Sequence, residues 1–143
     1  MTEATWQKEL LLFEENQERI LKMDPAEPMP SAQWCRDSSH FTLGPLTSCQ
    51  TAWLPLMVQL LDGKSTGFIS INPNPLFTKL RFATTPWEEL VERFVSERAV
   101  WRQILGEIDV TREIRTPKRI WTAPLLTRRL VEHEKRHLDD LTL

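Results

Sequence analysis

Apolar side chains recur at helical spacing along four stretches of the chain. In the first stretch, residues 5–23, they form one stripe, and glutamates occupy the opposite side. Asp24 and Pro25 end this stretch, because the residue before a proline avoids the α region. The pattern therefore predicts an amphipathic helix near the N-terminus. Its apolar stripe consists of Trp6, Leu10, Phe13, Ile20 and Leu21.

A second stripe follows a loop rich in proline and serine, and it begins between Thr42 and Pro45. Threonine is a favourable N-cap, and a proline fits the first turn of a helix, where its missing N–H is not needed. Pro55 lies inside the stripe, and we expect a kink there because the apolar positions continue to Leu61. Gly63 then stops the helix. The apolar face consists of Leu46, Cys49, Trp53, Leu56, Met57 and Leu60.

The third helix has the clearest start. Residues 85–88 are typical of a capping box, with Pro86 at the first helical position, and the apolar period then continues to Ile108. The preceding connection, residues 62–85, is long for a small helical domain and is expected to cross the bundle. Within it, residues 68–71 are a candidate short strand.

A polar link, residues 111–118, leads to the last helix. Thr122 or Thr127 can cap this helix, and Pro124 fits its first turn. Four helices with one long connection between the second and third predict an all-α fold, a four-helix bundle with a crossover, and residues 1–143 form one domain. The apolar members of the last helix are Leu126, Leu130, Val131, Leu138 and Leu141.

Composition and charge exclude several classes of function. The 143 residues include 18 Lys and Arg against 20 Asp and Glu, a net charge of -2. A nucleic-acid binder or a basic protein of membrane surfaces needs a cationic excess that is missing here. No apolar run is long enough for a transmembrane helix, and the chain shows no signal-peptide pattern. We therefore expect a cytoplasmic protein whose two cysteines are reduced thiols.

His133 and His137 are the first candidates for chemistry. They are four residues apart and lie in the same stripe as Leu126 and Leu130, so both imidazoles are predicted to face the interior of the bundle and could hold one cation. Two imidazoles facing a core need hydrogen-bond partners or a metal, because an unpaired buried polar group costs about 1–3 kcal/mol. The alternative is a pair without function near the C-terminal end.

A third ligand could come from Cys49 or His40. A thiolate is an excellent zinc ligand, but a free cysteine also packs commonly as a small apolar residue, and it can act as a nucleophile. Glu134, beside the histidines, could orient a water or act as a catalytic base, or it could be an exposed partner in a salt bridge. The histidines also match the H-E-x-x-H pattern of zinc proteases, although both intervening positions after Glu134 are basic.

The order of these elements resembles the DinB/YfiT-like superfamily of four-helix metal-binding proteins. The similar features are a proline-rich loop with Trp34 after the first helix, the aromatic-hydroxyl pair Phe41-Thr42 at the second helix, and His-x-x-x-His in the last helix. In that family the third ligand follows the aromatic residue by eight positions and is usually histidine. The corresponding residue here is Cys49.

The resemblance implies a metal site formed by Cys49, His133 and His137. Such a donor set would favour zinc, whereas a site of three histidines also suits nickel or manganese. Characterised members of the family include transferases and isomerases that use low-molecular-weight thiols, and others are classed as metal-dependent hydrolases. The resemblance therefore implies hydrolysis or thiol transfer on a small molecule, and a homodimer. Cysteine in place of histidine also supports an alternative, a metal-free bundle that acts as a binding or interaction module.

Overall fold

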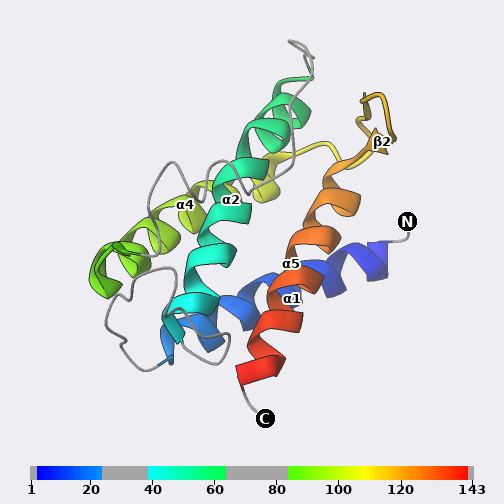
Figure 1. Cartoon of the computed structure of the whole chain (residues 1–143). Helices are drawn as coiled ribbons and strands as arrows, with labels where there is room; N and C mark the ends of the chain where they lie inside the picture. Colours follow the sequence, from blue (N-terminus) through cyan, green and yellow to red (C-terminus); the bar gives the residue numbers. More distant parts are fainter. Residues whose placement is uncertain (1–2, 24–38, 64–83, 142–143) are drawn as a thin grey trace.

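The computed structural model describes residues 3–23, 39–63 and 84–141. Within them four helices form a bundle, which confirms the predicted all-α class (Figure 1). The expected crossover and the candidate strand at residues 68–71 lie outside the described residues. None of the described helices is both long and apolar enough to cross a membrane. The helices are α1 (Glu3–Leu21), α2 (Ser39–Asp62), α4 (Trp87–Glu107) and α5 (Ala123–Leu141).

Helix α2 packs against both α4 and α5, and α1 packs against α5 (Figure 1). The larger apolar cluster draws on all four helices and on the short segment before α5. A second cluster joins the C-terminal turns of α1 and α5 to the N-terminal turns of α2 and α4. This second cluster consists of Ile20, Leu43, Leu46, Trp87, Leu90, Phe94 and Leu138.

Helix α2 begins earlier than the sequence pattern predicts. It starts at Ser39, so Thr42 is not its N-cap and Pro45 is not in its first turn. Both Pro45 and Pro55 lie inside the helix, where each lacks the N–H that would bond to the carbonyl four residues back. The helix nevertheless continues past Pro55 to Asp62, as expected. Packing of its apolar face on two neighbouring helices offsets the missing hydrogen bonds.

The C-terminal end of α2 has a glycine and an arginine as caps. Gly63 adopts the left-handed conformation (φ 71°), and its N–H donates to the carbonyl of Gln59 at 2.9 Å. Arg112 donates to the carbonyl of Leu61, one of those that the helix leaves without an intrahelical partner. A Cβ atom at Gly63 would lie 3.1 Å from this guanidinium, so both features favour glycine at this position.

The starts of α4 and α5 test two further predictions: the one for α4 is wrong, and one of the two caps considered for α5 is confirmed. Pro86 is the N-cap of α4, with no hydrogen bond from a capping side chain, so the predicted capping box with Pro86 inside the helix is wrong by one position. Thr122 accepts a hydrogen bond from the N–H of Leu125 at 3.2 Å and caps α5, whereas Thr127 lies inside the helix.

The link before α5 is not wholly irregular. Residues Ile114–Arg115 (β1) and Ile120–Trp121 (β2) pair as a two-stranded antiparallel sheet, with Ile114 opposite Trp121. Ile114 and Trp121 are both buried, and they bring this hairpin against the main apolar cluster. The hairpin thereby lies next to the N-terminal end of α5 (Figure 1).

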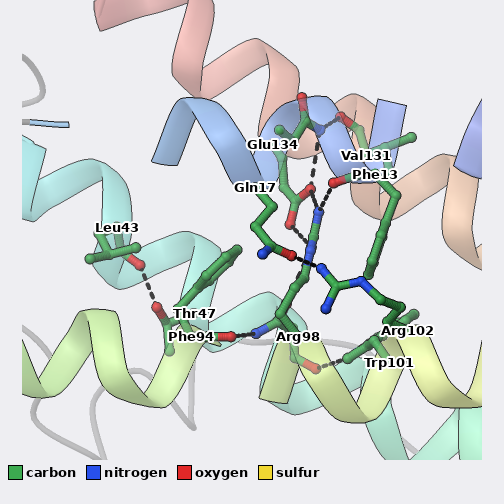
Figure 2. A network of polar contacts seen from close by, with 12 residues as sticks. Phe13, Gln17, Leu43, Thr47, Phe94, Arg98, Trp101, Arg102, Val131 and Glu134 are labelled. Carbon is green, nitrogen blue, oxygen red and sulfur yellow. Dashed lines mark hydrogen bonds and ion pairs between the residues drawn. The ribbon is translucent and has the colours of Figure 1, made fainter. Parts of the chain in front are cut away.

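A buried ion pair connects all four helices. Arg98 of α4 is fully buried, and its guanidinium donates to both oxygens of Glu134 on α5, at 2.6 and 2.9 Å (Figure 2). The same guanidinium donates to the carbonyl of Phe13 on α1 at 2.8 Å and to Oε1 of Gln50 on α2 at 3.2 Å. It also lies 3.6 Å from the centroid of the Phe13 ring. One side chain therefore contacts each of the other three helices.

Two amides extend this network. Asn16 on α1 donates to Oε1 of Glu134 at 3.1 Å, and Gln50 donates to the carbonyl of Phe94 at 2.9 Å. Glu134 is fully buried like Arg98, so each ion depends on these partners for the stabilisation that water would otherwise give. The pair is a bidentate arrangement, the strongest form of an arginine–carboxylate contact.

We predict that Glu134→Gln lowers the free energy of unfolding by about 3–5 kcal/mol, because it leaves the charge of Arg98 buried without a counter-ion. Urea denaturation measures this change. The double variant Arg98→Met/Glu134→Leu removes both charges and should recover most of the loss. As a control, Arg102→Gln breaks an exposed pair with Glu14 and should cost less than about 1 kcal/mol. A Glu134→Gln protein as stable as the original would contradict the prediction.

Candidate functional site

The structure brings together residues of α2 and α5 that the sequence separates widely. Cys49 lies in the middle of α2, His133 lies near the middle of α5, and His137 follows one turn later. The Sγ atom of Cys49 is 3.9 Å from Nε2 of His133, across 84 positions of sequence. The rings of His133 and His137 meet edge to face, with centroids 4.6 Å apart. The packing of α2 on α5 thus brings Cys49 to His133, and His137 lies against His133.

Aromatic and cationic side chains border this site on one side. Trp53, one turn after Cys49 on α2, has its ring 6.1 Å from the ring of His133. Arg129, one turn before His133 on α5, lies over two indole rings, with Cζ 5.8 Å from the centroids of Trp53 and of Trp121. The site is therefore continuous with a row of arginine and tryptophan side chains.

Burial controls the protonation of Cys49. The residue is 3% exposed, and burial, together with the negative charge of Glu134, raises the pKa of its thiol to about 12. The positive charge of Arg129 opposes these effects but does not cancel them. In the protein without a bound cation, Cys49 is consequently a neutral thiol near physiological pH.

Both histidines are neutral for a related reason. Burial, with smaller contributions from the nearby His137, Arg136 and Arg129, lowers the pKa of His133 to about 4. Burial also lowers the pKa of His137, although Asp140 acts in the opposite direction. A neutral imidazole keeps a lone pair for a metal ion or a hydrogen-bond donor. The Nδ1 atom of His133 is buried and has no hydrogen-bond partner among the described residues.

A thiol sulfur and two imidazole nitrogens are the types of atom that bind zinc, and the distance between the donor atoms of Cys49 and His133 also suits a zinc site. Two ligands of one tetrahedral zinc, a thiolate and an imidazole, lie about 3.5 Å apart. The 3.9 Å between Cys49 and His133 is close to this value. Within the described part of the chain, however, no three His, Cys, Asp or Glu side chains are arranged to hold a metal. A side chain must therefore reorient before Cys49, His133 and His137 could share one ion.

The structure places Glu134 in the core and not on the surface. Its carboxylate oxygens accept hydrogen bonds from Arg98 and Asn16, so the alternative of an exposed salt bridge is wrong: the salt bridge exists but is buried. These bonds give Glu134 a structural role, and its role as a base stays a prediction. His40 lies in the first turn of α2, and nine helical residues set its backbone about 14 Å along the axis from Cys49.

The sequence reading missed Arg98, although the sequence contains a signal for it. Arg98 lies four positions after Phe94 and three before Trp101, which puts a charged residue inside the apolar stripe of α4. A lone arginine in such a stripe indicates a buried partner of opposite charge, because an unpaired buried ion is costly. The helical spacing of α5 does not indicate that Glu134 is the partner of Arg98.

Comparison of the chain with protein-family models, with curated proteins and with solved structures found no match. The resemblance to the DinB/YfiT-like superfamily therefore rests on the sequence motifs, to which the structure adds a four-helix bundle. The ligands and activities of that family are assigned to this chain only as a proposal.

We predict that the metal-depleted protein loses stability as the pH falls from 6.5 towards 4. In that range an unfolded chain binds a proton at His133, whereas the folded chain, with a pKa of about 4 at this residue, does not. The free energy of unfolding should therefore decrease with decreasing pH, and urea denaturation at several pH values measures it.

The matched variants are His133→Gln, which removes the titrating group, and His40→Gln, which removes a histidine elsewhere. The pH dependence should become shallower in His133→Gln and stay unchanged in His40→Gln. Equal pH dependence in His133→Gln and the original protein would contradict the assigned pKa of His133.

Proposed function

We propose that the protein is a metal-dependent enzyme that acts on a small molecule, with one divalent ion held by Cys49, His133 and His137. Zinc is favoured over nickel or manganese because a thiolate is among the donors. The observation that carries the proposal is the 3.9 Å approach of Cys49 Sγ to His133 Nε2. Helical spacing alone accounts for the proximity of the two histidines, but only the packing of α2 on α5 accounts for the cysteine.

Protonation supports the same assignment. His133 and His137 are neutral and need lose no proton before they bind a cation. Cys49 is a buried thiol, and a divalent cation is the group that would stabilise its thiolate in this position. Metal affinity should consequently rise with pH. A zinc ion with three protein ligands keeps an open position, where it lowers the pKa of a bound water or thiol, which suits hydrolysis or thiol transfer.

Elemental analysis of the purified, untagged protein tests the proposed site. We expect about one zinc, nickel or manganese ion per chain. Cys49→Ala and the double variant His133→Ala/His137→Ala should lose the metal while keeping the helical circular-dichroism signal. Cys35→Ala and His40→Ala are the matched controls and should retain it. Unchanged metal content in the double variant would overturn the proposal, and loss of metal in His40→Ala would assign His40 as a ligand.

A second candidate function is supported by a separate observation. Cys49 is a member of the main apolar cluster, and no three metal-binding side chains of the described residues are arranged as a ligand set. Both facts are those expected of a metal-free bundle that acts as a binding or interaction module. In that protein Cys49 packs as a small apolar residue, and the histidines are structural.

Thermal unfolding with and without a chelator separates the two functions. A metal that binds only the folded state raises Tm by mass action, so the enzyme hypothesis predicts a Tm lower by several degrees after chelation. The metal-free hypothesis predicts an unchanged Tm. The His133→Ala/His137→Ala variant serves as the control, because the chelator should have no effect on it in either case.

A further inference from the structure

Five of the ten arginines in the described residues form an ion pair with a carboxylate, and Arg129 is not among them. Within the described residues no ion pair involves Arg129, and the exposed Glu132, three residues later on α5, forms no ion pair with it. Its guanidinium instead lies over two buried indole rings, those of Trp53 and Trp121. The arginines that do form ion pairs are Arg19, Arg93, Arg98, Arg102 and Arg128.

A second cation shares one of these rings. The Cζ atom of Arg119 lies 5.1 Å from the centroid of Trp121, and no described carboxylate pairs with Arg119 either. Two guanidinium groups are thus held near one indole without a negative charge to balance them. The attraction between a cation and an aromatic face fixes each group in place but leaves its N–H donors unbonded. Such an arrangement creates a local positive potential that attracts anions.

This cationic site adjoins the cysteine–histidine site. Arg129, His133 and His137 follow one another at four-residue intervals on one face of α5, and one turn of helix separates Arg129 from His133 by about 6 Å. Trp53 is near both, with its ring centroid 5.8 Å from the guanidinium carbon of Arg129 and 6.1 Å from the ring centroid of His133. A small molecule of a few heavy atoms is long enough to reach from one site to the other.

We propose that Arg129 binds an oxyanion of the substrate, a carboxylate or a phosphate group, one helical turn from the Cys49–His133 pair. The cation–π contacts hold the guanidinium of Arg129 beside both Trp53 and Trp121, and the edge of a guanidinium carries parallel N–H donors that match two oxygens of such an anion. The substrate is then an anionic small molecule. This substrate class rests on the proposed function, whereas anion binding at Arg129 does not require the metal.

Nuclear magnetic resonance of the full chain, labelled with ¹⁵N, tests this site with two probes. The Nε–Hε signal of Arg129, assigned by its loss in Arg129→Gln, is followed during titration with acetate and, separately, with inorganic phosphate, at constant ionic strength. We expect a saturable shift with at least one probe, and the anion that saturates first identifies the preferred group. Indole signals of Trp53 and Trp121 should shift in the same titration.

Arg129→Gln should weaken binding of that anion by about tenfold or more, the loss expected from one charge-assisted hydrogen-bond pair. Arg102→Gln is the matched control, because it removes the same charge from a guanidinium already paired with Glu14, and binding should stay unchanged. Equal weakening in both variants would show an effect of net charge alone and overturn the assignment. A titration without a saturable shift for either anion would also overturn it.

The His133→Ala/His137→Ala variant separates this inference from the proposed function. If the shift of Arg129 persists there with the same affinity, the arginine site is supported whether or not the protein binds a metal. If anion binding disappears with the histidines, the anion binds at the metal site, so the assignment to Arg129 fails while the metal proposal stands. Metal content, measured by elemental analysis, decides the proposed function independently of the titration.

Discussion

The buried ion pair between Arg98 and Glu134 is the contact on which the arrangement of the four helices depends. Both side chains are fully buried, so each ion depends on its hydrogen-bond and ion-pair partners for stabilisation. Those partners come from every helix: the carbonyl of Phe13 on α1, Gln50 on α2 and Asn16 on α1 again, with the ion pair itself joining α4 to α5. A helix that slides or rotates breaks at least one of these bonds. Apolar contacts are less demanding, because they tolerate small shifts.

The position of Glu134 in the core also determines where the candidate ligands lie. Successive residues of a helix are about 100° apart, so α5 cannot direct Glu134 at Arg98 without placing His133 at the side of the core. That side is the contact surface with α2, where His133 meets Cys49. The histidines are therefore half-buried. The apolar stripe alone would instead place them at the centre of the core. One structural contact thus fixes the rotation of the helix that carries the proposed site.

The two ends of the α2–α5 surface have different electrostatic character. Around Cys49 burial favours neutral groups, so the thiol keeps its proton and the imidazoles remain uncharged. One turn away Arg129 is a permanent cation that lies over two indole rings. A substrate that spans both would place its anionic group at the arginine and its reacting group near the thiol and imidazoles. The two ends differ because a guanidinium keeps its charge in surroundings where a thiol stays protonated.

The sequence by itself determined the class of fold, the four helices and several of their ends, because periodicity, glycine and capping residues act within a few positions. The cap at Thr122 and the stop at Gly63 are such local features. Local rules failed at the start of α2, which begins at Ser39 and not at Thr42, and at Pro86, which is the N-cap of α4 and not its first helical residue. Only the tertiary structure decided that Glu134 pairs with Arg98 and that Cys49 meets His133. Helical spacing fixes which residues share a face of one helix, but the rotation of each helix against its neighbours depends on the packing of all of them at once.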